Sequence, residues 1–109
     1  MKKDKLKKLE RAGWRVGTVA DFLGLSKSEA ALVELKLGLG KSLRERRVRR
    51  GVSQQSLARL LRSSQSRVAK MEAGDPSVSL DLLVRSLLAI GVTREEVGRA
   101  IARPLKKAV

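Results

Sequence analysis

A chain of 109 residues, 42% of them apolar, is long enough for one small domain and an extension. Only 2% of the residues are aromatic, so a core must be built from Leu, Val and Ala, which favours packed helices over a sheet. The net charge of +14 indicates a polyanionic partner, and a duplex with its dense line of phosphates is the first candidate. An anionic membrane surface and RNA are the alternatives. The scarcity of aromatic rings to stack on unpaired bases argues against RNA.

The chain contains no cysteine and no histidine. This composition excludes disulfides and the usual zinc sites, and it removes the commonest general base. We therefore expect no metal, no cofactor and no enzymatic activity. The basic N-terminus is not followed by the apolar core of a secretory signal, and no window approaches the roughly 18 apolar residues of a membrane span. These features predict a bacterial-type cytoplasmic protein, associated with the nucleoid if it binds DNA.

Residues 1–25 are predicted to form an N-terminal extension in two parts. Residues 1–12 carry six Lys or Arg against two acids, and they form either a short helix or a disordered arm. This segment either lies along phosphates or is a solvated tail. Residues 13–25 hold the two aromatic residues, Trp14 and Phe22. These side chains either cover the domain's own core or form a docking motif for another protein or a second copy.

A helix is predicted to begin directly after Ser26. Residues 26–29 have the sequence of a capping box, and leucines at helical spacing follow. Gly38 and Gly40 each cost about 1 kcal/mol inside a helix. We therefore expect either one helix to Arg50 or two helices divided near these glycines, which could also mark close packing of another helix.

Residues 42–51 carry five arginines against one glutamate. Leu43 and Val48 are the predicted core contacts of this mostly exposed helical segment. Arg47 and Arg50 lie nearest the segment that follows and are predicted to bind phosphate. The alternative is that these arginines form a solubilising face.

Residues 53–74 have the pattern of two short helices joined by a tight turn. Ser53 and Ser64 are predicted to cap them, because a serine hydroxyl accepts a hydrogen bond from a free N–H of the first turn. Gly74 suits the left-handed position that ends a helix. The predicted inward residues are Leu57, Ala58, Leu60 and Leu61 in the first helix, and Val68 and Met71 in the second.

The outward face of the second helix, about residues 65–73, is polar. It carries Gln65, Ser66, Arg67 and Lys70. Gln pairs well with adenine, and Arg or Lys pairs with guanine, while Ser bonds base acceptors or a phosphate. We predict that these four residues read bases, with a phosphate contact as the alternative for Arg67. A merely hydrated polar face is the other interpretation.

Residues 53–74 resemble the helix-turn-helix of the Xre family, which includes the Cro and repressor proteins of lambdoid phages. The resemblance covers roughly residues 39–91 and rests on Gln54, Leu57, Ala58, the turn at 62–64, Gln65, Val68, Met71, Glu72 and Gly74. It implies that Gln54 contacts a phosphate and buttresses Gln65, and that Glu72 is structural and pairs with a nearby Arg. Arg62 stands where the family usually has Gly, and a left-handed Arg costs about 1 kcal/mol. The predicted phosphate-binding set is Arg47, Arg50, Gln54 and Ser64.

Two further helices are predicted after Gly74. Ser79 caps the first, which ends at Gly91, and residues 93–96 form a second capping box. The last helix ends before Pro104. The predicted organisation is an extension over residues 1–25, a helical domain over 26–103 and a basic tail over 104–109.

The resemblance implies an all-α bundle of four to five helices, similar to lambda repressor, with an N-terminal extension. It also implies a sequence-specific, double-stranded-DNA-binding transcriptional regulator, a repressor, that forms a homodimer. The helix over residues 93–102 and the segment 14–25 are the candidate dimer surfaces. The layout is also similar to HigA-type antitoxins, which neutralise a small ribonuclease toxin and repress their own operon, and this is the alternative function.

Overall fold

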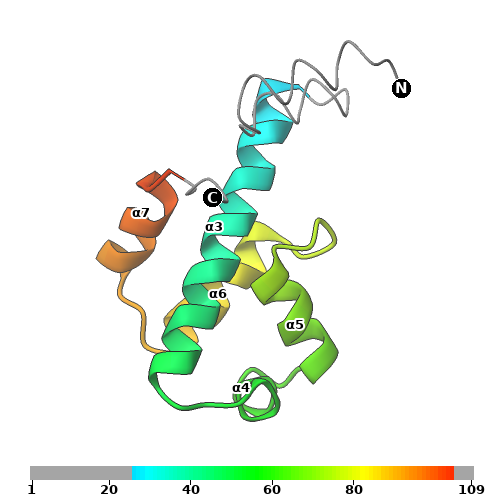
Figure 1. The fold of residues 1–109 in the computed structure, drawn as a ribbon, viewed down its shortest axis with the longest axis vertical. Coiled ribbons are helices and arrows are strands. Elements are labelled where there is room, and N and C mark those ends of the chain that lie inside the picture. The colour runs from blue at the N-terminus through cyan, green and yellow to red at the C-terminus, as the bar shows by residue number, and fades with distance from the viewer. Residues whose placement is uncertain (1–25, 105–109) are drawn as a thin grey trace, which may run out of the picture. The chain divides into compact units, whose positions relative to one another are not determined.

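The computed structural model describes residues 26–104, which contain five helices and, within that range, no strand (Figure 1). The helices are α3 (Lys27–Arg49), α4 (Gln54–Leu60), α5 (Gln65–Ala73), α6 (Leu80–Ala89) and α7 (Arg94–Ala102). The all-α prediction is therefore confirmed. Residues 35–104 form one compact unit. The predicted arm, docking segment and basic tail lie outside the described residues, apart from Pro104.

Helix α3 is continuous through both glycines. It begins with the predicted capping box, in which the Ser26 N–H donates to Glu29 Oε1 at 3.0 Å and the Glu29 N–H donates to Ser26 Oγ at 3.2 Å. Gly40 is explained by close packing, because a Cβ at this position would lie 2.3 Å from the Met71 carbonyl oxygen. The C-terminal end of α5 thus rests directly on the backbone of α3, and only glycine leaves room for it.

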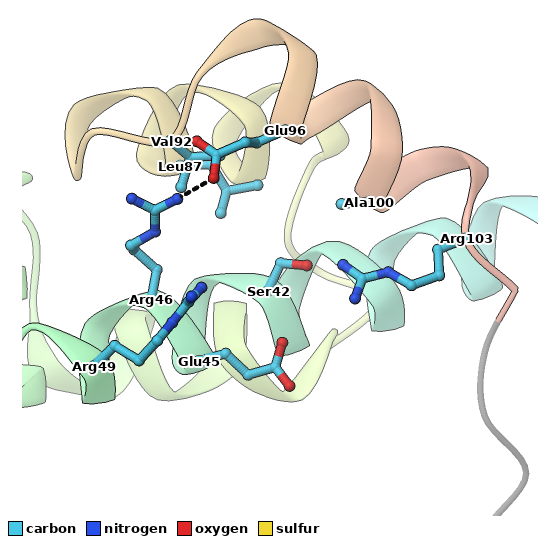
Figure 2. A pocket seen from close by; sticks show the side chains of 9 residues that line it. All are labelled: Ser42, Glu45, Arg46, Arg49, Leu87, Val92, Glu96, Ala100 and Arg103. Carbon is cyan, nitrogen blue, oxygen red and sulfur yellow. Dashed lines mark hydrogen bonds and ion pairs between the residues drawn. The ribbon is translucent and has the colours of Figure 1, made fainter.

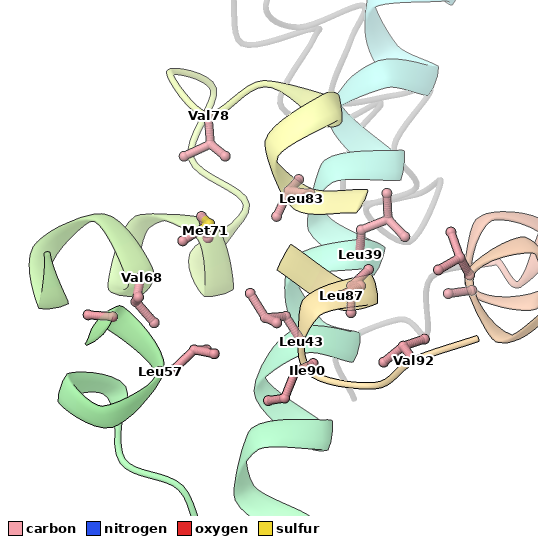
Figure 3. Close-up of a cluster of buried hydrophobic side chains, with 13 residues drawn as sticks. Leu39, Leu43, Leu57, Val68, Met71, Val78, Leu83, Leu87, Ile90 and Val92 are labelled. Carbon is pink, nitrogen blue, oxygen red and sulfur yellow. The ribbon is translucent and has the colours of Figure 1, made fainter. Parts of the chain in front are cut away.

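The core lies where α3, α4, α5 and α6 meet. Figure 3 shows its side chains converging from these elements. Those with no exposed surface include Leu39, Leu43, Leu57, Val68, Met71, Leu83 and Leu87. Val97 and Ala100 extend the same cluster onto α7. Burial of this apolar surface is the main force that holds the helices together.

Two predicted core residues are in fact exposed. Val48 is 58% exposed and Leu60 is 59% exposed, so both predictions are wrong. A helix turns about 100° per residue, which places Val48 about 140° around α3 from buried Leu43. Leu60 falls outside the buried arc that Leu57 and Ala58 define on α4. In both places the sequence is apolar where the helix geometry points to solvent.

Serine or threonine caps each of the four shorter helices. The hydroxyl oxygens of Ser53, Ser64, Ser79 and Thr93 accept first-turn N–H groups at 3.0, 3.1, 3.1 and 3.1 Å respectively. Glu96 completes the predicted box at the start of α7 by accepting from the Thr93 N–H at 3.0 Å. Replacing such a cap by alanine typically costs about 1 kcal/mol, so the caps define where each helix starts.

Candidate nucleic-acid interface

The turn between α4 and α5 sets the angle at which α5 leaves α4. Arg62 has a φ of 54° and is the one non-glycine residue with positive φ in the described range. The Ser63 N–H donates to the Ala58 carbonyl at 2.8 Å, which closes the end of α4. The predicted left-handed Arg is therefore present, and this turn uses an arginine where glycine would adopt the same backbone without strain.

Helix α5 has one buried apolar face and an exposed polar surface. Val68 and Met71 are fully buried, and Gly74 ends the helix in the left-handed conformation with a φ of 67°. The predicted base-reading residues Gln65, Ser66, Arg67 and Lys70 are all exposed. These four side chains are therefore exposed to solvent on a helix whose buried face packs against the core.

The four exposed polar residues do not share one line along α5. At about 100° per residue, Ser66 lies opposite the buried pair and Lys70 lies about 40° from Ser66. Gln65 and Arg67 lie about 100° from Ser66 on either side. The helix thus presents Ser66 and Lys70 at the centre of its outward face, and Gln65 and Arg67 at opposite edges.

Two alanines that were not predicted as site residues also lie on this outward face. Ala69 and Ala73 are exposed, and they lie between Gln65 and Ser66 around the helix at about 100° per residue. An alanine methyl group can contact the methyl group of thymine in the major groove. The 3.6-residue period could have identified them, but a search for polar side chains passes over alanine.

An ion-pair network holds α5 against α3 and α4. Arg47 Nε donates to Glu72 Oε2 at 2.5 Å, and Arg47 Nη2 donates to Glu72 Oε1 at 3.0 Å. Gln54 Nε2 donates to the same Oε1 at 3.1 Å, and Arg47 Nη1 donates to the Val52 carbonyl at 2.9 Å. The Glu72 side chain is 4% exposed and that of Arg47 is 13% exposed. The hydrogen bonds to Glu72 raise the pKa of Arg47, so this guanidinium group stays charged.

Two of the predicted phosphate-binding residues, Arg47 and Gln54, take part in this network. The guanidinium group of Arg47 donates three hydrogen bonds within the protein. The amide of Gln54 bonds to Glu72, and it makes no hydrogen bond to Gln65 within residues 26–104. Glu72 pairs with a nearby arginine, as the resemblance implies. The contact with the carbonyl of Val52 is not predictable from the sequence, because every residue type has the same backbone acceptor.

The other two predicted phosphate-binding residues have partners of different kinds. Arg50 Nη1 donates to the Ile90 carbonyl at 3.0 Å, so this side chain braces the end of α6. Ser64 uses its hydroxyl as the α5 cap and remains exposed. Ser64 alone among the four therefore stands at the start of α5, where free N–H groups and the helix dipole favour an anion.

The surface around α5 is cationic. Arg59, Arg62, Arg67 and Lys70 are exposed, and none of them forms an ion pair with an acid in the described part of the chain. Glu72, the acid on α5, is buried and neutralised by Arg47. Such a surface attracts a polyanion.

A comparison with known families decides the class of this protein. Residues 39–100 match the family model described as a helix-turn-helix domain, which covers more than half of the 109 residues. The chain belongs to this helix-turn-helix family. The match extends from Leu39 in α3 to Ala100 in α7 and supports DNA binding. Searches of curated proteins and of solved structures found no match.

The described residues of this helix-turn-helix protein offer neither a metal site nor a membrane span. Among them, no group of three His, Cys, Asp or Glu residues is placed to hold a metal ion. None of the described helices combines the length and the apolar character needed to cross a membrane.

Proposed function

We propose that this helix-turn-helix protein is an Xre-like, sequence-specific transcriptional repressor that places α5 in the major groove of double-stranded DNA. The observation that carries the proposal is the arrangement of α5. Val68 and Met71 are fully buried on one side, Glu72 is fixed to Arg47, and exposed polar side chains spread across the remaining surface of the helix. A rigidly held helix with such a face suits reading base edges, because each base pair presents a distinct pattern in the major groove.

The position of each side chain around α5 suggests its role. Ser66 and Lys70 lie at the centre of the outward face and are proposed to contact bases, with Gln65 reading a base from one edge. Ala69 is proposed to pack against a thymine methyl group. Arg67 lies on the opposite edge and is proposed to bind a phosphate, where it would fix the register of the helix without reading sequence.

Two positions at the starts of helices complete the proposed backbone contacts. Ser64 and the first N–H groups of α5 face outward and suit a phosphate oxygen. Gln54 begins α4, and its side chain remains half-buried against Glu72. Phosphate contacts by Gln54, Arg47 and Arg50 stay predictions from the family resemblance, and for Arg47 the internal hydrogen bonds oppose the role.

A single module of this size buries about 600–1,000 Å² on DNA, which gives limited specificity. We therefore propose that the protein binds as a homodimer to a pseudo-palindromic site, with the two α5 helices about one turn of DNA apart. The antitoxin alternative depends on residues 1–25, which lie outside the described residues, and it stays a prediction. The proposed function is one of binding, without an enzymatic step.

The proposal is tested by measuring affinity for two duplexes with fluorescence anisotropy. One duplex carries a site selected from a random library by the wild-type protein, and the other is a scrambled version. Gln65→Ala and Lys70→Ala should each weaken binding to the selected site by about 1–3 kcal/mol and binding to the scrambled duplex much less. Arg85→Ala is the control, because Arg85 lies exposed on α6. Equal losses on both duplexes would remove Gln65 and Lys70 from base reading.

The repressor role is tested separately with a reporter gene whose promoter overlaps the selected site. Wild-type protein should lower expression, and the Gln65→Ala variant should restore it. A rise in expression with the wild-type protein would identify an activator instead.

A further inference from the structure

A groove lies between α3 and the C-terminal end of α7, away from the proposed DNA-reading face. It has a volume of about 650 Å³ and is lined by Lys41, Arg44, Glu45, Val48, Arg49 and Arg103. In Figure 1, α7 lies on one side of α3, whereas α4 and α5 lie on the other. A molecule in this groove would therefore leave the outward face of α5 free.

A smaller pocket of about 100 Å³ adjoins the groove, since Glu45, Arg49 and Arg103 line both. Figure 2 shows the side chains of Arg49 and Arg103 extending toward Ser42 from two sides. Within the part of the chain that the structure describes, neither of these arginines forms an ion pair. The pocket is thus bordered by guanidinium groups and a hydroxyl group, which all donate hydrogen bonds to an anion.

Arg46 adds a third guanidinium group to the smaller pocket. Its Nη2 donates to Glu96 Oε2 at 2.5 Å. Its Nε is buried and has no hydrogen-bond partner among residues 26–104, although a buried donor left unpaired is costly. A carboxylate in this pocket would meet a lining that includes three guanidinium groups, which attract it.

The groove is not uniformly cationic, which indicates the kind of occupant. Val48 is 58% exposed in its wall, and it would bury apolar surface against a bound side chain. Glu45 lines both the groove and the pocket, and Glu96 lines the pocket. A uniformly charged phosphate backbone would meet these acids and an apolar wall. A peptide with both acidic and apolar side chains matches this mixture better.

A second copy of this chain is a poor occupant for the same groove. The groove is itself rich in cations, and a chain with 25 Lys or Arg against 11 acids offers it few acidic side chains. Outside the described residues, the remaining segments are also net positive, since residues 1–25 and 105–109 together hold nine Lys or Arg and three acids, counted from the sequence. Charge complementarity therefore requires a different, acidic chain.

The geometry points to a docking site on this groove for an acidic segment of another protein. A carboxylate of that segment binds among Arg46, Arg49 and Arg103, and an apolar side chain packs on Val48. Since the groove lies across α3 from α5, the protein can hold its partner and DNA together. The inference concerns a surface that DNA reading does not use, so it stands or falls independently of the proposed function.

The test measures binding of a short fluorescein-labelled peptide, in which pairs of Glu and Leu alternate, to the full-length chain at physiological ionic strength. The double variant Arg49→Glu, Arg103→Glu should bind this peptide on the order of tenfold more weakly. The matched control is Arg85→Glu, Arg94→Glu, which changes the net charge equally at exposed positions that do not line the groove. The control should stay close to wild type.

A second comparison isolates the apolar contact. Val48→Ser should weaken binding of the Glu–Leu peptide but leave unchanged the binding of a peptide with Ser in place of each Leu. Val48 is largely exposed, so this substitution leaves the core intact. Equal loss with both peptides would remove Val48 from the docking site.

Each other outcome overturns the inference in a specific way. Equal weakening of the two charge-reversed variants would mean that the peptide responds only to net charge, and failure of the wild-type chain to bind it would exclude the site. If the Arg49, Arg103 variant loses affinity for the selected duplex, and the duplex competes with the peptide, the groove is a phosphate-binding surface. If that variant changes the sedimentation of the free protein from one oligomeric state to another, the groove is an interface between copies.

Discussion

The Glu72→Ala substitution should strongly destabilise the domain. Glu72 accepts two hydrogen bonds from Arg47 and one from Gln54, and with 4% of its side chain exposed water cannot replace them. Removing one member of such a buried pair leaves the other charge uncompensated, which costs about 3–5 kcal/mol. A small domain has a free energy of unfolding of only about 5–15 kcal/mol. Urea unfolding followed by circular dichroism should therefore show a much lower midpoint.

The exposed Glu95 on α7 supplies the control, because Glu95→Ala should change the free energy of unfolding by no more than about 0.5 kcal/mol. A loss below about 1 kcal/mol for Glu72→Ala would refute the argument from burial. Arg47→Ala separates two explanations of that arginine. If it leaves stability unchanged and lowers the salt dependence of DNA binding by about one phosphate, then Arg47 contacts DNA and the internal pairing is not its main role.

Four further predictions concern single positions. A Cβ at Gly40 would lie 2.3 Å from a backbone carbonyl of α5, so Gly40→Ala should lower the free energy of unfolding by about 1–3 kcal/mol. A Cβ at Gly98 meets nothing within 4 Å, so Gly98→Ala should raise the free energy of unfolding by about 1 kcal/mol. Arg62→Gly should stabilise the turn by about 1 kcal/mol in urea unfolding. The hydrogen bond from the Thr93 N–H lowers the pKa of the Glu96 carboxyl group. The carboxylate therefore adds to the free energy of unfolding above the ordinary glutamate pKa of about 4.3. This contribution is lost as the pH falls through the lowered pKa. The free energy of unfolding of a Glu96→Gln variant should not show this loss as the pH falls.

Short-range chemistry explains why most of the fold is predictable from the sequence. The caps at Ser53, Ser64 and Thr93 act within three residues along the chain, so their spacing alone reveals them. The left-handed backbone at Arg62 was implied by the family resemblance, because glycine usually stands at this position in the family. The sequence did not decide whether α3 is one helix or two. The reason for Gly40 is its close approach to the backbone of Met71, which lies far along the chain.

The outward face of α5 was predictable for the same reason, since its period follows from Val68 and Met71. The roles of the arginines before it were not. Arg46, Arg47 and Arg50 are bonded to Glu96, Glu72 and Ile90 respectively, and these partners are 25–50 residues away along the chain. A run of like charges gives no sign of which members will meet an acid after folding.

Arg46 and Arg47 show how one helix can serve two surfaces. Consecutive residues on a helix point about 100° apart, so these neighbours reach different elements: Arg47 binds Glu72 on α5, and Arg46 binds Glu96 on α7. The charge of Arg47 is neutralised by a buried acid, which leaves the exposed cations around α5 to set the field that DNA would meet. The partner of Arg46 is more exposed, at 35% of its side chain, and Arg49 and Arg103 lie beside it without an acid of their own within the described residues. Among the described residues, exposed cations without an ion pair thus stand both around the outward side of α5 and along the groove beside α7.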